Sequence, residues 1–130
     1  MSGIHPRGLP CHTERTVGDI TVMDLRGEID ILTAPLVSAR VDALTADPHP
    51  DLVLDLRRVS FIDCAGLSVL CRARNRTTAR FGRLRLVTDS ARFLRTLRHA
   101  GLSGAFDVHA QLPEAATDEP EARVVSTAAD

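Results

Sequence analysis

Two side chains that could take part in chemistry stand next to each other, Asp63 and the thiol of Cys64, where a short apolar run ends and a helical pattern begins. An aspartate directly before a helix is typical of an N-cap. At such a position the helix macrodipole and the free backbone N–H groups favour a thiolate, whereas the neighbouring Asp63 disfavours it. Two interpretations of Cys64 therefore stay open: a thiol that reacts with oxidants, or a small and inert packing side chain.

Three aspartates, Asp30, Asp55 and Asp63, fall close to the ends of expected strands. Such clusters can bind Mg²⁺. Turn-forming and capping roles account for each aspartate without a metal. The five histidines are scattered along the chain without a ligand spacing. We therefore expect no metal and no cofactor.

The three cysteines form neither a disulfide framework nor a metal-binding pattern. On one helix, Cys64 and Cys71 would lie about 10.5 Å apart along the axis, beyond the roughly 7 Å that a disulfide spans between Cα atoms. A phosphate-binding Cys-x5-Arg loop that starts at Cys64 would need arginine at position 70, which is Leu70. A Cys–His catalytic pair needs a positioned base, and no histidine lies close in sequence. We predict that the chain is not an enzyme.

Basic charge is concentrated in one part of the chain, although the net charge is only −1. All sixteen basic residues are arginines, and nine of them lie between Arg72 and Arg98, where Asp89 is the only acid. Such a region can bind phosphates or acidic proteins. Because few aromatic residues are interleaved for base stacking, we favour a solvated helix face and expect no direct contact with nucleic acid. A nucleic-acid interface would instead depend on Arg72, Arg76 and Arg80.

Length and composition bound the class of protein. A chain of 130 residues suits one domain, and its 44% apolar and 25% charged residues are ordinary for a globular protein. No apolar run approaches the roughly 20 residues that a membrane span needs, and the N-terminus lacks the features of a signal peptide. We expect a cytoplasmic protein without membrane contact, either a monomer or a weak homodimer.

Strand and helix patterns alternate along most of the chain, which predicts an α/β fold with one mixed sheet of four to five strands and helices packed on it. We expect an N-terminal extension over 1–8, a single domain over 9–117 and a disordered acidic tail over 118–130. The expected strands span residues 9–15, 19–26, 52–56, 84–87 and 106–109, and the expected helices lie between Thr33 and Pro48, over 65–81, from Asp89 or Ser90 to Gly101, and over 113–117.

The helix expected over 65–81 carries the most detailed pattern. Leu67, Leu70 and Cys71 form an apolar stripe that Thr78 and Phe81 continue. Glycine at position 82 is suited to the left-handed residue that ends a helix. The start of this helix is at once a helix N-terminus and the end of a connection from a buried strand, which is where α/β sheets place their binding sites.

Three segments resemble the STAS domains of the anti-anti-sigma factors, also called anti-sigma factor antagonists. Gly27–Asp30 is similar to the Gly-Glu-Leu-Asp segment after the second strand of that family, and Thr33-Ala34 matches the start of its first helix. Asp63–Leu67 stands where the family usually reads Asp-Ser-Ser-Gly-Leu. The segments follow in the family's order, within a resemblance that covers about 14–109. The resemblance implies a STAS fold.

The resemblance also implies a function. In that family the first serine of the loop is phosphorylated by the partner anti-sigma kinase, and here Cys64 stands at that position and Ala65 at the second serine. We therefore expect a regulatory protein that docks on an anti-sigma factor of the ATP-binding serine-kinase type and controls sigma-factor release without the usual phosphate switch. Neither Ser60 nor Ser68 replaces the missing acceptor by position. The implied docking residues are Asp30, Asp63, Cys64, Ala65, Gly66, Leu67 and Ser68.

A second functional class stays open beside the first. A STAS module can also act as a sensor or scaffold, by assembling with copies of itself or through a redox change at Cys64. Oxidation of Cys64 to a sulfenic acid would put a polar group where the family puts a phosphate.

Overall fold

The alternating pattern of the sequence produces one mixed β-sheet in the computed structural model, which describes residues 12–117 and 124–126. The strand order is β5-β4-β3-β2-β1-β6. Strands β2 to β5 run parallel to one another, and β1 pairs antiparallel with β2 on one side and with β6 on the other. The strands are β1 His12–Val17, β2 Ile20–Ile29, β3 Asp51–Ile62, β4 Arg83–Val87, β5 Asp107–His109 and β6 Val124–Ser126.

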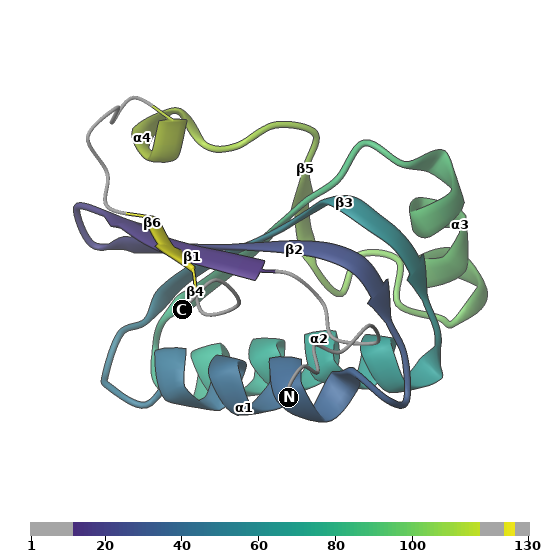
Figure 1. Ribbon diagram of the computed structural model, residues 1–130, viewed down its shortest axis with the longest axis horizontal. Coiled ribbons are helices and arrows are strands. Elements are labelled where there is room, and N and C mark those ends of the chain that lie inside the picture. Colours follow the sequence, from purple (N-terminus) through teal and green to yellow (C-terminus); the bar gives the residue numbers. More distant parts are fainter. Residues whose placement is uncertain (1–11, 118–123, 127–130) are drawn as a thin grey trace, which may run out of the picture.

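Helices cover the two faces of the sheet unequally. Figure 1 shows α1 and α2 side by side under one face, α3 beyond the end of β3, and the short α4 over the opposite face. The helices are α1 Ala34–Leu44, α2 Cys64–Ala79, α3 Ala91–His99 and α4 Glu114–Thr117. None of the helices that the structure describes is long and apolar enough to cross a membrane.

The predicted α/β architecture is confirmed, with one strand more than the four to five expected. The additional strand is β6, which pairs with β1. It lies within 118–130, the range that was predicted to be disordered. The polar and acidic composition around these residues had favoured a disordered tail over a strand. The remainder of the expected tail, and the N-terminal extension over 1–8, lie outside the described residues.

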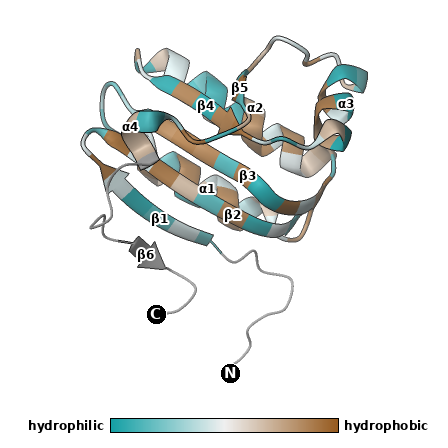
Figure 2. Ribbon diagram, turned by 90° about the horizontal axis from the view of Figure 1, so that it is seen from above, coloured by the Kyte–Doolittle hydropathy of each residue, from teal (hydrophilic) through white to brown (hydrophobic). Residues whose placement is uncertain are grey.

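The central strand β3 supplies both faces of the core. Its residues Leu52, Leu54 and Leu56 pack in the cluster that α1 and α2 cover, whereas Val53 lies in a smaller cluster on the other face with Ala116. Side chains that alternate between two covered faces give the continuous apolar run at 52–54. Figure 2 shows the hydrophobic colouring concentrated on the inner strands, with β1 at the hydrophilic edge.

The end of α2 differs from the sequence expectation. The left-handed backbone conformation falls on Phe81, with φ of 57°, and not on Gly82. A Cβ at Gly82 would collide with the carbonyl oxygen and ring of Pro50, so the glycine is needed for a close approach and not for its φ. The predicted apolar stripe also ends early, because Thr78 is exposed and Phe81 is 83% exposed.

Candidate partner-docking site

Helix α2 begins directly after β3, and Asp63 holds its first turn. One carboxylate oxygen of Asp63 accepts hydrogen bonds from the backbone N–H groups of Ala65 at 2.9 Å and Gly66 at 3.1 Å. The predicted N-cap is therefore confirmed. These two bonds satisfy N–H groups that a helix start otherwise leaves unpaired.

The first turn of α2 is seated against the carboxyl ends of β2 and β3. The backbone N–H of Asp63 donates to the carbonyl of Ile29 at 3.3 Å. At Gly66, a Cβ would collide with the Ile62 side chain and the Ile29 carbonyl oxygen. Glycine at this position lets the helix approach the strand ends closely.

The loop between β2 and α1 is held by Asp30 and Thr33. Asp30 Oδ1 accepts hydrogen bonds from the backbone N–H groups of Leu32 at 3.0 Å and Thr33 at 3.1 Å. Thr33 stands at the N-cap position of α1, but its hydroxyl donates to the carbonyl of Glu28 at 2.9 Å and makes no capping bond. This tight turn leaves the two residues between Asp30 and Thr33 outside it, so that Ile31 is 73% and Leu32 74% exposed.

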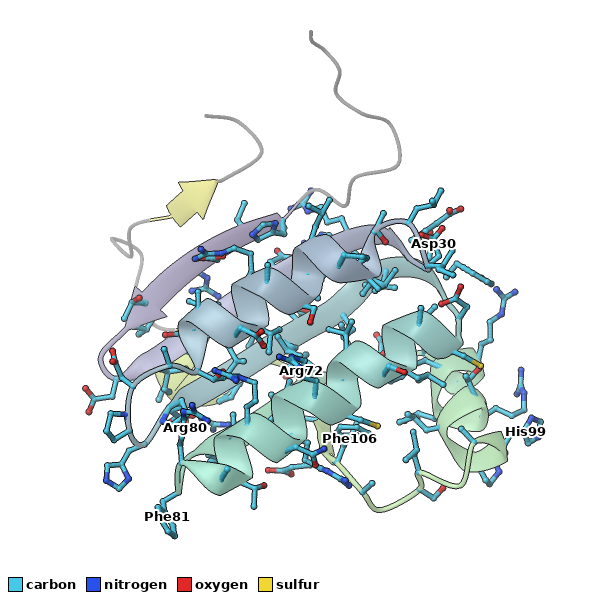
Figure 3. The ribbon with its side chains drawn as sticks, turned by 90° about the horizontal axis from the view of Figure 1, so that it is seen from below. Asp30, Arg72, Arg80, Phe81, His99 and Phe106 are labelled. Atoms are coloured by element: carbon cyan, nitrogen blue, oxygen red, sulfur yellow. The ribbon has the colours of Figure 1, made fainter. Side chains whose placement is uncertain are left out.

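The two loops bring exposed side chains together at one end of the helical layer. Leu36 of α1 is 46% exposed, and Cys64 and Ser68 of α2 are exposed as well. Because β2 and β3 are parallel, the starts of α1 and α2 lie at the same edge of the sheet. We call the surface formed by Ile31, Leu32, Leu36, Cys64 and Ser68 the apical surface. In Figure 3, Asp30 marks this end of the layer and Phe81 marks the opposite end.

Of the seven residues predicted to bind a partner, the structure exposes two. Cys64 is exposed, and the hydroxyl of exposed Ser68 donates to the Cys64 carbonyl at 3.0 Å. Gly66 and Leu67 are buried in the seat of α2. Asp30, Asp63 and Ala65 are half-buried, and both aspartates use their carboxylates inside their own loops.

Sequence reasoning missed the three apolar members of the apical surface, Ile31, Leu32 and Leu36. The sequence did contain an indication of this surface, because two consecutive large apolar residues stand between Asp30 and Thr33, inside a turn. Turns lie on the surface, where an apolar pair gains nothing from folding. Contiguous exposed apolar surface is typical of an interaction site.

The cysteines of α2 are both free thiols. Cys64 and Cys71 line one hollow of about 520 Å³ along the helix, with Leu67 and Leu102 as its apolar part. The expectation that they form no disulfide is met for these two, and Cys11 lies outside the described residues.

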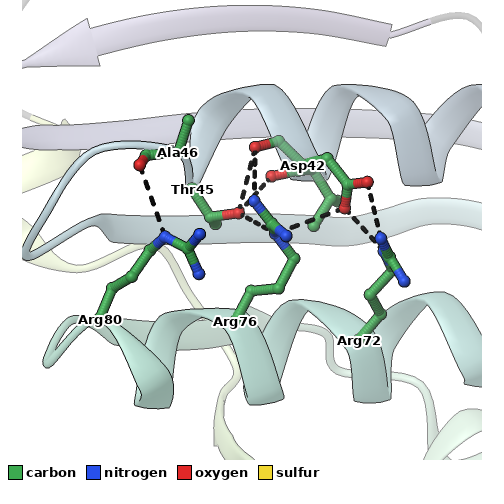
Figure 4. A network of polar contacts seen from close by, with 7 residues as sticks. Asp42, Thr45, Ala46, Arg72, Arg76 and Arg80 are labelled. Carbon is green, nitrogen blue, oxygen red and sulfur yellow. Dashed lines mark hydrogen bonds and ion pairs between the residues drawn. The ribbon is translucent and has the colours of Figure 1, made fainter.

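The three arginines at four-residue steps along α2 and its C-cap contact α1 and the residues directly after it, and Arg72 keeps half of its side chain exposed. Arg72 makes a two-bond contact with the Asp42 carboxylate at 2.7 and 2.8 Å (Figure 4). The hydrogen bond from Arg72 holds the pKa of Asp42 below its usual range. Arg76 donates to the Thr45 hydroxyl at 2.7 Å.

The same row continues with Arg80, which reaches the carbonyl of Ala46 at 3.5 Å. We call Arg72, Arg76 and Arg80, with their partners Asp42 on α1 and Thr45 and Ala46 directly after it, the arginine seam. The sequence pattern does not show that α1 lies alongside, so these contacts were not predicted, but Arg72 still keeps half of its side chain exposed, as expected for a solvated face. The seam also leaves the arginines on which a nucleic-acid interface would depend already engaged within the protein.

The three aspartates that were considered as metal ligands, Asp30, Asp55 and Asp63, all bind groups within the protein. Buried Asp55 accepts from the guanidinium of Arg57 at 2.9 and 2.8 Å, while Asp30 and Asp63 bind backbone N–H groups. Burial, and next the nearby Asp55 carboxylate, raise the pKa of Asp24 on the adjacent strand. Across 12–117 and 124–126, no group of three or more His, Cys, Asp or Glu side chains is placed to hold a metal ion.

Comparison with known proteins settles the family. The STAS domain profile matches residues 13–115, which includes the whole of the site just described. The chain belongs to the STAS domain family. This STAS protein is 32% identical over 93 residues to an anti-sigma-B factor antagonist of Bacillus subtilis, covering 72% of this chain and 84% of the relative. It is 29% identical over 107 residues to the anti-sigma-F factor antagonist RsfB of Mycobacterium tuberculosis, covering 78% of this chain and 85% of the relative.

A solved structure supports the same assignment. The crystal structure of an anti-sigma factor antagonist from Mycobacterium paratuberculosis superposes with a TM-score of 0.73 at 26% identity. The match covers 90% of this chain and 97% of that one. The predicted resemblance to STAS domains is therefore confirmed, and the fold and its order of elements are those of an anti-sigma factor antagonist.

Proposed function

We propose that this STAS protein is an anti-sigma factor antagonist that docks on an anti-sigma factor of the ATP-binding serine-kinase type. The observation that carries the proposal is the apical surface, where apolar Ile31, Leu32 and Leu36 are exposed beside the capped start of α2. An apolar centre with polar surroundings is the usual composition of a specific protein interface. The names of the relatives, which describe antagonists of anti-sigma factors, support the same role.

The proposal includes a docking surface that is not switched by phosphate at the usual position. Cys64 and Ala65 provide no serine hydroxyl at the start of α2. The exposed hydroxyl of Ser68 lies one turn further along and donates to the helix backbone. We therefore propose that the unmodified chain is permanently competent to bind, and that it acts by binding and not by catalysis.

The test adds one negative charge at two positions of the same helix. Cys64→Asp places a carboxylate on the apical surface and should weaken binding to the ATP-binding anti-sigma factors of the source organism about tenfold or more, because a charge buried at an interface without a partner is costly. Asn75→Asp places the same charge on an exposed position three turns further along α2 and should bind as the parent does. Equal effects of the two variants, or no binding by the parent, would refute the proposal.

A separate experiment addresses the switch. Cys64→Ser restores a hydroxyl at the helix start, where serine is a favourable residue. We expect a cognate kinase to phosphorylate this variant and not the parent, as read by intact-protein mass spectrometry. Tight binding without phosphorylation would show that the kinase needs contacts other than the hydroxyl.

A sensing or scaffold role is the second candidate, and one observation favours it: Cys64 is a free, exposed thiol on the apical surface. In that case mild oxidation should change the oligomeric state or the choice of partner, and Cys64→Ala should abolish the change. Oxidation without effect on either would exclude this role for Cys64.

A further inference from the structure

A cavity separate from the apical surface lies between the end of β3 and helix α3. Its volume is about 170 Å³. Its apolar wall contains Leu56, Val59 and Phe93, and Phe61 stands at its mouth with half of its surface exposed. A volume below the roughly 300 Å³ typical of drug-sized pockets limits an occupant to a small molecule.

The polar part of this wall consists of hydrogen-bond donors. Thr88, which is 3% exposed, accepts a bond from the backbone N–H of Ser90 at 3.2 Å, so its hydroxyl proton is left to donate. The Ser90 hydroxyl accepts from the N–H of Phe93 at 3.1 Å and is likewise left with its proton. Thr88 is buried and Ser90 is exposed, and a hydroxyl that keeps its proton favours a ligand that accepts this hydrogen.

The one charged side chain among the residues that line the cavity is basic. Arg92 lines the cavity, and its guanidinium forms no ion pair with the residues that the structure describes. The nearest acid in sequence, Asp89, lines a different hollow together with Arg57. A guanidinium beside two or more hydroxyl donors is suited to a carboxylate.

We propose that this cavity binds a small organic carboxylate, with the acid group at Arg92, Thr88 and Ser90 and an apolar body against Leu56 and Phe93. The proposal does not depend on the docking function, because it concerns ligand binding by the chain alone. Ile62 joins the two sites physically, since it lines the cavity and packs against Gly66 in the first turn of α2. Binding of a ligand in the cavity is therefore expected to change the amide chemical shifts at the start of α2.

The experiment is a titration of the ¹⁵N-labelled full chain with sodium benzoate, followed by amide chemical shifts. Benzoate should bind with a dissociation constant in the millimolar range and move the resonances of Ile62, Thr88 and Phe93 and of the first turn of α2. Benzamide, which has the same shape without the charge, should bind about tenfold more weakly. Shifts that do not saturate at tens of millimolar, or equal binding of the two probes, would overturn the proposal.

Three variants test whether benzoate binds in this cavity. Arg92→Gln should weaken benzoate about tenfold and leave benzamide unchanged, and Thr96→Phe should block both probes because Thr96 lines the cavity. Arg95→Gln, an exposed position on the same helix outside the cavity, is the matched control and should bind as the parent does. Should Thr96→Phe fail to fold, the comparison of Arg92→Gln with Arg95→Gln decides alone, and equal affinities for benzoate would refute the site.

Discussion

The apical surface lies at the starts of α1 and α2, the arginine seam lies between their flanks, and the two regions are opposite in character. The seam holds charged side chains whose hydrogen-bonding groups are met by the neighbouring helix, at distances of 2.7 to 2.8 Å for Arg72 and Asp42. The apical surface holds apolar side chains that no other part of the described chain covers, with Leu32 at 74% exposed. In the arginine seam the charges make contacts within the protein, whereas the apolar side chains of the apical surface are left uncovered.

This difference has a physical origin in the topology. Parallel β2 and β3 send α1 and α2 back along the sheet in the same direction, so the helix flanks meet and can pair their charges. The helix starts project beyond this contact, and the strand ends lie beneath them. Ile31 and Leu32, on the loop that enters α1, are left without an element that covers them.

The largest expected effect on stability is at the seat of the apical surface. Gly66→Ala forces a methyl group against Ile62 and the Ile29 carbonyl, and should lower the free energy of unfolding by roughly 1–3 kcal/mol in urea denaturation. Ser68→Ala on the exposed side of the same helix should stay within about 0.5 kcal/mol of the parent. A Gly66→Ala variant as stable as the parent would show that α2 is not held closely at the strand ends.

A change in the seam should affect stability and leave docking unaltered. Arg76→Met removes hydrogen bonds to Thr45 and to the Asp42 carbonyl, and should cost about 1–2 kcal/mol of unfolding free energy. Arg95→Met, at an exposed position on α3, is the control and should be close to neutral. Weakened partner binding by a fully stable Arg76→Met protein would contradict the division between seam and apical surface.

The cap of α2 should contribute less than the seam. Asp63→Ala leaves the N–H groups of Ala65 and Gly66 without their acceptor, and should lower the unfolding free energy by about 1 kcal/mol. The matched change is Asp89→Ala, since Asp89 precedes α3 but the cap of that helix is Ser90. Equal losses in the two variants would mean that only the charge near a helix start matters.

The smallest expected effect is a gain at the far end of the layer. Phe81→Gly relieves a left-handed conformation that costs an L-residue about 1–2 kcal/mol, and after the added freedom of the unfolded chain it should stabilise by about 0.5–1 kcal/mol. Phe81→Ala keeps the backbone strain and should give no gain. A larger gain from alanine than from glycine would assign the effect to the exposed ring.

Features that depend on neighbouring residues were predictable from the sequence. Asp63 caps α2 and Ser90 caps α3, because an N-cap involves only the next two or three backbone groups. The order of strands and helices followed from local periodicity in the same way.

Features that depend on distant contacts were not predictable. The glycine at position 82 is required by Pro50, distant in sequence, while the left-handed conformation falls on Phe81. The arginine seam requires α1 beside α2, and exposure of Leu32 requires that nothing covers its loop. The only indication of this exposure in the sequence was the apolar pair Ile31 and Leu32 inside a turn.

The most direct test of the central claim compares two exposed apolar side chains at opposite ends of the helical layer. Calorimetric titration of an ATP-binding anti-sigma factor from the source organism with the Leu32→Asp variant should show affinity reduced about thirtyfold or more, as for the central residue of an interface. Phe81→Asp, which changes an even more exposed residue, should bind as the parent does. Parent-like binding by Leu32→Asp, or a comparable loss in Phe81→Asp, would contradict docking through the apical surface.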